Sequence, residues 1–308
     1  MSLRLRIGTR GSPLALAQTE EVTNRLARTH PELSTETVVV RTHGDEGYQR
    51  DLGTSLDGKR AFTKRLEDAL LANEIDVAVH SLKDVPTDAV EGIALAAVPA
   101  RADPRDVIVA RDGVSTQNPS RGTRIGTSSL RRRAQLLAHW PGLDVIELHG
   151  NVGTRLRRLD DRGLDAVVLA AAGLDRLRIR GRSVEPLDPG IVTPAPGQGA
   201  LAVECRSRDA ETRALLADIE DPVSRRAVET ERAVSARIGG SCNVPFGALA
   251  TLDGDVMELR AVVASVDGSR VIRGSAQGPA NRSSALVESV SRSLLDRGGR
   301  AILEEVSS

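Results

Sequence analysis

The chain has 308 residues, which is enough for two or three domains of about 100 to 150 residues each. Its 42 basic residues balance its 42 acidic residues, and its only aromatic residues are one Trp, one Tyr and two Phe. This composition argues against nucleic acid and membrane partners, because there is no global positive field and few rings on which bases could stack. Two cysteines give no disulfide framework, and neither a signal core nor an apolar run of membrane-spanning length is present, so we expect a cytoplasmic protein.

The first hundred residues alternate between predicted strands and helices. Leu3–Ile7 alternates with period two as a strand does, and Ser12 and Pro13 then open a helix whose apolar spacing continues to Leu26. The pattern goes on with a strand at 38–40, a Gly- and Asp-rich mobile loop at 43–59, a helix at 62–70, and strands at 75–79 and 93–98. The segment His80–Pro86 leaves the strand at 75–79 at its carboxyl end.

Two Pro-containing crossings divide the rest of the chain, one at Asp103-Pro104-Arg105 and one at 193–199. Between them, strands at 107–109, 124–126, 145–148 and 166–169 alternate with helices, which predicts βαβ units and a largely parallel sheet. After them come a strand at 200–204, helical patterns around Leu215 and Val228, three strands separated by Asp-Gly turns, and a helix at 283–297. We expect domains at 1–99 with 200–217, at 105–193 and at 222–308.

Four turns share one design, in which a strand ends, small or hydroxyl residues follow, and a helix begins with an arginine nearby. The arginines are Arg10, Arg131 with Arg132, Arg155 and Arg176. Helix amino ends and guanidinium groups both favour anions, and ligands of open α/β sheets bind beyond the carboxyl ends of the strands. No phosphate-binding glycine motif and no metal-ligand spacing is present, so the turns predict a ligand with several carboxylates.

Two residues, Cys242 and Asp84, could take part directly in a reaction. Cys242 lies between a glycine pair and Pro245, so it belongs to a loop, where it is either an ordinary thiol or a reactive or modified one. Asp84 follows Lys83 at a strand's carboxyl end and precedes Val85-Pro86. It is either a turn residue that bonds the local backbone or an acid/base carboxylate that neighbouring cations keep ionised.

Several segments together resemble one enzyme family. They are Gly8–Arg10 with Ser12–Ala15, His80–Pro86, Gly126–Arg132, Gly150–Arg155, Pro196–Ala200 and Gly240–Cys242. In this order, over residues 8 to 247, they resemble porphobilinogen deaminase (hydroxymethylbilane synthase).

The resemblance implies an α/β fold of two domains like a two-lobed periplasmic-type solute-binding protein, with the active cleft between them, plus a small C-terminal α+β domain. It implies a monomeric transferase of porphyrin and heme biosynthesis whose Cys242 carries a dipyrromethane cofactor through a thioether bond. Four porphobilinogen molecules would be added to this primer stepwise, each with loss of ammonia, and the resulting linear tetrapyrrole would then be hydrolysed from it.

The resemblance also assigns roles to residues. Asp84 would be catalytic, interacting with pyrrole nitrogens and stabilising a cationic azafulvene. Cofactor-binding residues would be Cys242, Lys83, Ser81, Thr127, Ser129, Arg131, Arg132, Gly150, Arg155 and Gln198, and substrate-binding residues would be Arg10, Ser12, Phe62 and Arg176. The sequence departs from the family pattern at His43 and His149, where Arg is usual, and in the 55–60 segment, which is usually richer in Gly and Lys.

Two other functions are compatible with parts of the sequence. A non-catalytic carboxylate-binding protein of the same two-lobed architecture would need the cleft but neither Cys242 nor a third domain. A cysteine acyl-transfer enzyme would need a base to generate the thiolate, and the sequence shows none near Cys242. Intact mass separates these alternatives, because only the deaminase carries two linked pyrrole units on its thiol.

Overall fold

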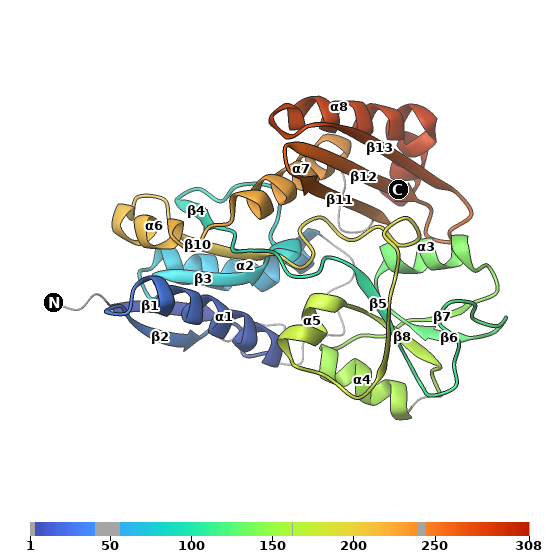
Figure 1. Cartoon of the computed structure of the whole chain (residues 1–308), viewed down its shortest axis with the longest axis horizontal. Helices are drawn as coiled ribbons and strands as arrows, with labels where there is room; N and C mark the ends of the chain where they lie inside the picture. Colours follow the sequence, from blue (N-terminus) through green and yellow to red (C-terminus); the bar gives the residue numbers. More distant parts are fainter. Residues whose placement is uncertain (1–3, 41–55, 162, 240–243, 308) are drawn as a thin grey trace. The chain divides into compact units, whose positions relative to one another are not determined.

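The computed structural model describes residues 4–40, 56–161, 163–239 and 244–307. The chain forms two compact units, Met1–Ala102 with Gly199–Arg226 and Asp103–Gln198 with Ala227–Ser308 (Figure 1). The described part contains three β-sheets, one in the first unit and two in the second. The three domain boundaries expected from the sequence stay a prediction.

The first unit is a five-stranded sheet with helices on both faces. Its elements are β1 (Arg4–Thr9), α1 (Pro13–Thr29), β2 (Ser34–Val39), α2 (Leu56–Leu71), β3 (Val77–Ser81), the 3-10 turn η1 (Leu82–Asp84), β4 (Ile93–Ala97), β10 (Leu201–Arg206) and α6 (Ala210–Ala217). The strand order is β2-β1-β3-β10-β4. Val22 and Leu26 of α1 pack against one face, and Leu66 and Leu70 of α2 pack against the other.

The second unit begins with another five-stranded sheet, in the order β7-β6-β8-β5-β9. Its elements are β5 (Asp106–Ala110), β6 (Arg124–Gly126), α3 (Leu130–His139), β7 (Asp144–Ile146), α4 (Val152–Asp161), β8 (Ala166–Ala170), α5 (Ala171–Arg176) and β9 (Ser183–Pro186). Leu136 of α3 covers one face, and Leu156 and Leu159 of α4 cover the other.

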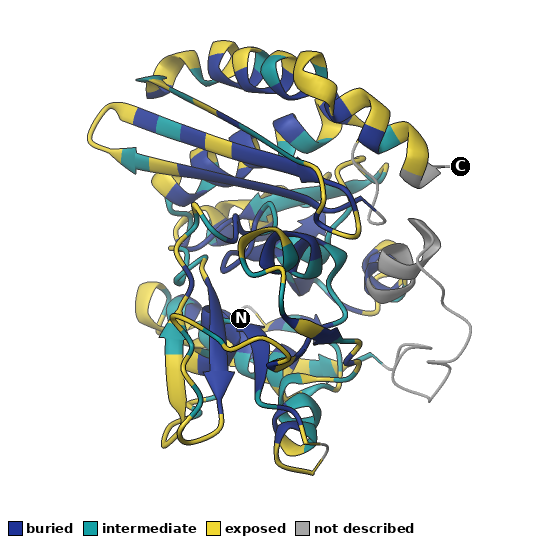
Figure 2. Cartoon of the chain, turned by 90° about the vertical axis from the view of Figure 1, so that its right-hand side faces the viewer, coloured by how far each residue is buried: buried dark blue, intermediate teal, exposed yellow. Residues whose placement is uncertain are grey.

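The rest of the second unit is a small α+β domain. It contains α7 (Pro222–Ile238), which continues from the first unit, the antiparallel strands β11 (Phe246–Asp253), β12 (Val256–Ala264) and β13 (Val271–Pro279), the 3-10 turn η2 (Ala280–Arg282), α8 (Ser283–Leu294), the π-helical turn η3 (Leu295–Gly299) and α9 (Arg300–Ser307). Helices α7 and α8 pack on one face of its sheet. Strands β11 and β12 are mostly buried, whereas β13 is mostly intermediate or exposed, and α8 exposes its outer side (Figure 2).

The segment 193–198 lies against this small domain. The amide of Ala248 on β11 donates to the carbonyl of Pro194 at 3.0 Å. A Cβ on Gly247 would lie 2.6 Å from the carbonyl oxygen of Thr193, so only glycine fits there. The fully buried carboxylate of Glu231 accepts hydrogen bonds from the amides of Gly197 and Ala250, at 2.7 and 2.9 Å. The second crossing is therefore fixed by the C-terminal sheet.

The expected fold class is confirmed: two α/β lobes and a small C-terminal α+β domain. The expectation of largely parallel sheets is wrong, because β10 runs antiparallel to β3 and β4, and β5 runs antiparallel to β8 and β9. Strands β5 and β10 are the first strands after the two crossings, so their direction does not come from a βαβ connection.

Two local predictions also need correction, and one strand was missed. Helix α2 begins at Leu56, so the loop expected at 43–59 is wrong over 56–59, while 43–55 lies outside the described residues. Strand β9 was not predicted, since its short exposed sequence lacks an apolar alternation. The expected helix at 283–297 ends at Leu294, and Gly298 (φ 104°) interrupts the helical backbone before α9.

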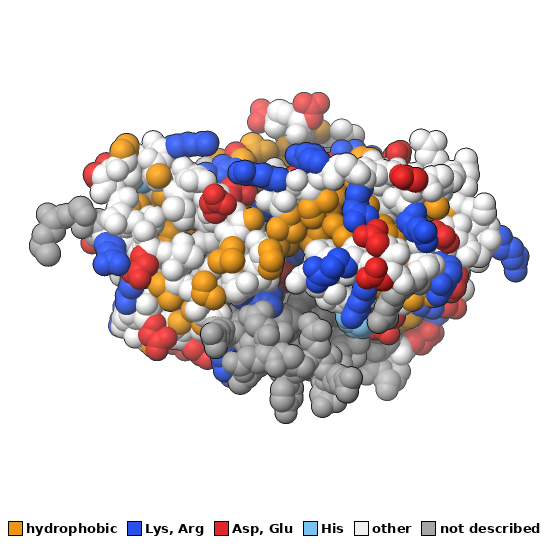
Figure 3. Space-filling model, turned by 90° about the horizontal axis from the view of Figure 1, so that it is seen from below, with side chains coloured by type: hydrophobic (Ala, Val, Ile, Leu, Met, Phe, Trp, Pro, Cys, Tyr) orange, Lys and Arg blue, Asp and Glu red, His pale blue; other side chains and the backbone are white. Residues whose placement is uncertain are grey.

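The surface agrees with the balanced composition. On the face drawn in Figure 3, basic and acidic side chains are interspersed rather than gathered into a field of one sign. None of the helices in the described ranges combines the length and apolar character that a membrane span requires.

Candidate active site

Polar residues gather at one edge of the second sheet. Strands β6, β7 and β8 are parallel neighbours, so their carboxyl ends lie at the same edge, and the turns after β6 and β7 open α3 and α4 there. Strand β5 runs the opposite way, and its first residue, Asp106, pairs with Ala170 at the end of β8. This edge therefore receives a carboxylate from the amino end of a strand, and the sequence analysis did not include Asp106 among the site residues.

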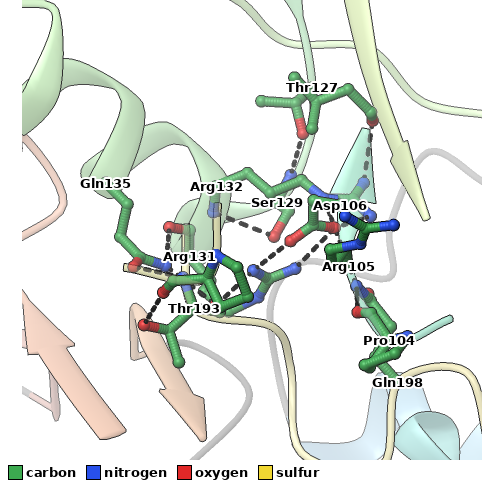
Figure 4. A network of polar contacts seen from close by, with 12 residues as sticks. Pro104, Arg105, Asp106, Thr127, Ser129, Arg131, Arg132, Gln135, Thr193 and Gln198 are labelled. Carbon is green, nitrogen blue, oxygen red and sulfur yellow. Dashed lines mark hydrogen bonds and ion pairs between the residues drawn. The ribbon is translucent and has the colours of Figure 1, made fainter. Parts of the chain in front are cut away.

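Asp106 is the centre of the polar network in Figure 4. Its side chain has no exposed surface, and Arg131 Nη1 lies 2.6 Å from one oxygen while Arg132 Nη2 lies 2.7 Å from the other. The amide of Gln198 donates a further hydrogen bond to Asp106 at 3.0 Å. Burial alone would raise the pKa of Asp106, but the charges of Arg131 and Arg132 outweigh it and hold that pKa well below its usual range. Asp106 is therefore an anion at neutral pH.

Arg131 and Arg132 are also held by backbone carbonyl groups. Arg131 Nη1 donates to the carbonyl of Thr193 at 2.7 Å, and Arg132 Nη1 donates to that of Val168 at 3.0 Å. Both side chains are buried. The structure thus pairs both guanidinium groups, expected to hold ligand carboxylates, with one internal carboxylate, so that two positive charges meet a single negative one.

Arg155, in the first turns of α4, adds a third positive charge. Its Nη2 donates to Ser128 Oγ at 3.3 Å, while its buried Nε has no hydrogen-bond partner among the described residues. Burial, and then the charge of Arg132, lower the pKa of Arg155 to about 10. A cation in this situation is stabilised by an anion, so three guanidinium groups with one carboxylate define a site for a ligand with negative groups.

The turns around this cluster are built as the sequence predicts. Ser129 caps α3 by accepting a hydrogen bond from the amide of Arg132, and Thr127 Oγ1 accepts one from the amide of Ser129. Asn151 caps α4 through the amide of Thr154 at 2.9 Å. Gly150 has φ 111°, a backbone conformation that favours glycine. These residues fix the helix starts from which the arginines project.

The first unit carries the other predicted residues. Strands β1 and β3 are parallel neighbours, so Arg10 and Ser12 after β1 lie at the same edge as Ser81, the last residue of β3, and Asp84, which follows it. Ser12 caps α1 through the amide of Ala15.

Asp84 is the last residue of η1, and both it and Lys83 are partly buried. Gln18 of α1, which the sequence analysis did not single out, donates to Ser81 Oγ at 2.7 Å. The sequence feature that could have identified Gln18 is its place, as a polar residue, on the buried face of the amphipathic helix α1.

Four of the residues singled out from the sequence either differ from the expected design or cannot be placed in the site. Arg176 is the last residue of the six-residue helix α5, whose start has no side-chain cap, so this turn lacks the design of the other three. His149 is exposed and pairs with Glu147 at 2.8 Å. Phe62 lies in α2, but its side chain is outside the described part, as is all of Cys242. Helix α7 does end before the thiol, at Ile238, and Gly239 has φ 68°.

These features define the class of the protein: a two-lobed α/β protein with a cluster of arginines whose charge suits an anionic ligand. In the described ranges, no group of three or more His, Cys, Asp or Glu residues could hold a metal ion.

Comparison with known proteins gives the family. Residues 5–214 match "Porphobilinogen deaminase, dipyromethane cofactor binding domain", and residues 226–296 match the C-terminal domain of the same enzyme. The chain therefore belongs to the porphobilinogen deaminase family.

Two relatives show how far the similarity extends. The porphobilinogen deaminase of Roseiflexus castenholzii is 44% identical over 299 residues, which cover 97% of this chain and 98% of the relative. That of Stenotrophomonas maltophilia (strain K279a) is 46% identical over the same length and with the same coverage. Among solved structures, the BenM effector binding domain with benzoate is 15% identical, covering 71% of this chain and 91% of that one, with a TM-score of 0.43. That likeness is too weak to carry an argument.

Proposed function

We propose that this chain is the transferase that joins four porphobilinogen molecules head to tail into hydroxymethylbilane, with loss of ammonia, on a dipyrromethane primer bound to Cys242. The observation that carries the proposal is the cluster of Arg131, Arg132 and Arg155, which lies within the residues that match the cofactor binding domain. A carboxylate-binding protein without catalysis is the alternative.

The residues present fit such a cofactor. Each pyrrole of the dipyrromethane cofactor bears acetate and propionate groups. Two guanidinium groups that share one internal carboxylate, together with the guanidinium group of Arg155, can compensate the charge of these groups. When bound, the cofactor supplies the primer to which substrate units are added. Arg131, Arg132 and Arg155 would hold its carboxylates, Ser129 and Thr127 fix the helix start that carries two of them, and the thioether to Cys242 would keep it attached.

Asp84 is the residue to which we assign the chemistry. It lies at the end of η1 beside Lys83, where Pro86 prevents the helix from continuing. Its carboxylate can accept a hydrogen bond from a pyrrole N–H and stabilise the positive charge that develops on the ring as ammonia leaves. Arg10, Ser12, Arg176 and Phe62 would bind the incoming substrate. We further propose a cytoplasmic monomer; the two cysteines of the sequence form no disulfide framework, which is typical of a reducing compartment.

Intact mass of freshly purified protein tests the cofactor. The wild-type chain should exceed its polypeptide mass by two linked pyrrole units and react with Ehrlich's reagent, whereas Cys242→Ser should show the bare mass and no colour. A wild-type chain that has only its polypeptide mass would contradict the proposal and favour the non-catalytic carboxylate-binding protein.

Turnover of porphobilinogen tests the role of Asp84. We expect Asp84→Asn to keep its fold and to lose activity by a factor of about 10² or more, since the neutral amide cannot stabilise a developing cation. The exposed Asp88 lies four residues further on, so Asp88→Asn is a matched control that should keep wild-type turnover. Near-normal turnover in Asp84→Asn would remove the assigned role.

A further inference from the structure

Arg273 connects the C-terminal sheet to the back of the arginine site. It lies on β13, where Val262 is its partner on β12. Its Nη2 donates to the carbonyl of Ile191 at 2.9 Å, and its Nη1 donates to Thr193 Oγ1 and to Gln135 Oε1, both at 3.3 Å. One side chain of the C-terminal sheet thus holds both the 191–193 segment and helix α3, all within the second unit.

The groups that Arg273 contacts are the ones that position Arg131. Gln135 is almost completely buried, and its Oε1 accepts the amide of Thr193 at 2.9 Å. Its Nε2 donates to the carbonyls of Arg131 and Thr193, both at 3.2 Å. The carbonyl of Thr193 in turn accepts a hydrogen bond from Arg131 Nη1 (Figure 4). Arg273 is therefore one hydrogen-bonded residue away from Arg131 by two routes, through Gln135 and through Thr193.

In the described part of the chain, the three hydrogen-bond acceptors of Arg273 are all neutral oxygens, so no carboxylate matches its charge there. Burial lowers the pKa of Arg273. A partly buried guanidinium without an ion pair is unfavourable on its own account, so its contribution lies in the three acceptors that its planar fork holds in place. Arg260 on the neighbouring strand differs, because it pairs with Glu258 at 2.7 Å and is exposed.

We propose that Arg273 is a positioning residue for Arg131: by fixing Gln135 and Thr193 from the C-terminal sheet, it directs the Arg131 guanidinium toward the carboxylates of the bound cofactor. The inference rests on the proposed function for the identity of that ligand. It gives the C-terminal sheet a part in shaping the anion site.

The test compares Arg273→Gln and Arg273→Lys with the matched control Arg260→Gln, each in the full-length chain. We expect both Arg273 variants to raise KM for porphobilinogen about fivefold, with kcat changed less than twofold, and to lower the fraction of folded protein whose intact mass includes the cofactor. Arg260→Gln should match the wild type in both measurements. A lower Tm with wild-type KM and wild-type occupancy would overturn the proposal, since Arg273 would then only stabilise the fold.

A second measurement separates this inference from the proposed function. In the Cys242→Ser background, which carries no cofactor, amide hydrogen exchange of peptides spanning Thr193 should be about tenfold faster in Arg273→Gln than in Arg260→Gln, because Thr193 loses its fixed partners. Unchanged exchange at Thr193 overturns the positioning role even if the wild type carries its cofactor. Conversely, bare wild-type protein overturns the proposed function, while the exchange data still decide whether Arg273 fixes Thr193.

Discussion

Arg131 and Arg132 share the carboxylate of Asp106, while Arg155 in the next helix donates only to a serine among the described contacts. When the ligand is absent, the first two arginines still have a carboxylate partner, whereas Arg155 has none among the described contacts. Arg155 should therefore contribute to ligand binding at the expense of the stability of the empty protein.

Replacing Arg155 tests whether it strengthens ligand binding while lowering the stability of the empty protein. In cofactor-free Cys242→Ser protein, Arg155→Leu should leave the free energy of unfolding unchanged or raise it by about 1 kcal/mol, because a partly buried cation near Arg132 is removed. In the loaded protein the same change should raise KM for porphobilinogen about tenfold. Urea unfolding and steady-state kinetics check the two halves.

Arg157→Leu, an exposed substitution on the same helix, is the control and should stay within about 0.5 kcal/mol of its parent. A clear loss of stability in cofactor-free Arg155→Leu would contradict the interpretation.

The sequence predicts some residues of the site better than others. The caps at Ser12 and Ser129 were predictable, since each lies directly before a helical apolar pattern, and so was the location of Arg131 and Arg132 at a helix start. Asp106 was not included, because its place at the ligand edge depends on the direction of β5, which no local pattern encodes.

At the scale of elements, strand β11 packs directly against the backbone of the 193–195 segment and so fixes the second crossing. We predict that Gly247→Ala destabilises the protein by about 2 kcal/mol or more, because its Cβ would lie 2.6 Å from the carbonyl oxygen of Thr193 and only backbone movement could relieve the overlap. Gly153→Ala is the matched control, since its Cβ would have no neighbour closer than 3.6 Å and alanine favours the helix α4.

Thermal unfolding of the two variants decides this prediction. Gly153→Ala should melt at or slightly above the wild-type temperature, and Gly247→Ala several degrees below it. Equal melting temperatures for the two variants would show that the backbone of the 193–195 segment can move with little loss of stability, which contradicts the prediction.

The type and order of most elements follow from the sequence, because apolar period and turn residues are local properties. Pairing does not. The places of β10 between β3 and β4, and of β5 between β8 and β9, are set by contacts across the whole chain. Strand β9 and the break at Gly298 lack a local signal strong enough to predict them.

At the scale of the molecule, buried carboxylates make stability depend on pH. Burial would raise the pKa of Asp76, but hydrogen bonds from Arg6 and Arg206 lower it to about 2. The pKa of Asp106 is lowered in the same way by Arg131 and Arg132. A carboxyl group whose pKa is lower in the folded state contributes stability that is present above the unfolded pKa, near 4, and is lost as the pH falls through the folded value.

We therefore expect the free energy of unfolding to fall steeply between pH 4 and pH 2. Asp76→Asn should make this fall shallower by about 2 kcal/mol, since the variant has already lost that contribution at neutral pH. Urea unfolding at a series of pH values measures it. Asp175→Asn, which changes an exposed carboxylate beside Arg180, should keep the wild-type slope, and an unchanged slope in Asp76→Asn would refute the assignment.

The insertion of β10 between β3 and β4 has a consequence for the newborn chain. Among the described strands, β4 has β10 as its sole neighbour, yet β4 leaves the ribosome about a hundred residues earlier. At ordinary translation rates it waits roughly 5 to 20 seconds for that neighbour. During this interval the apolar strand Ile93–Ala97 keeps an open edge, so the speed of synthesis and the access of chaperones to that edge influence how much of the protein reaches its native state.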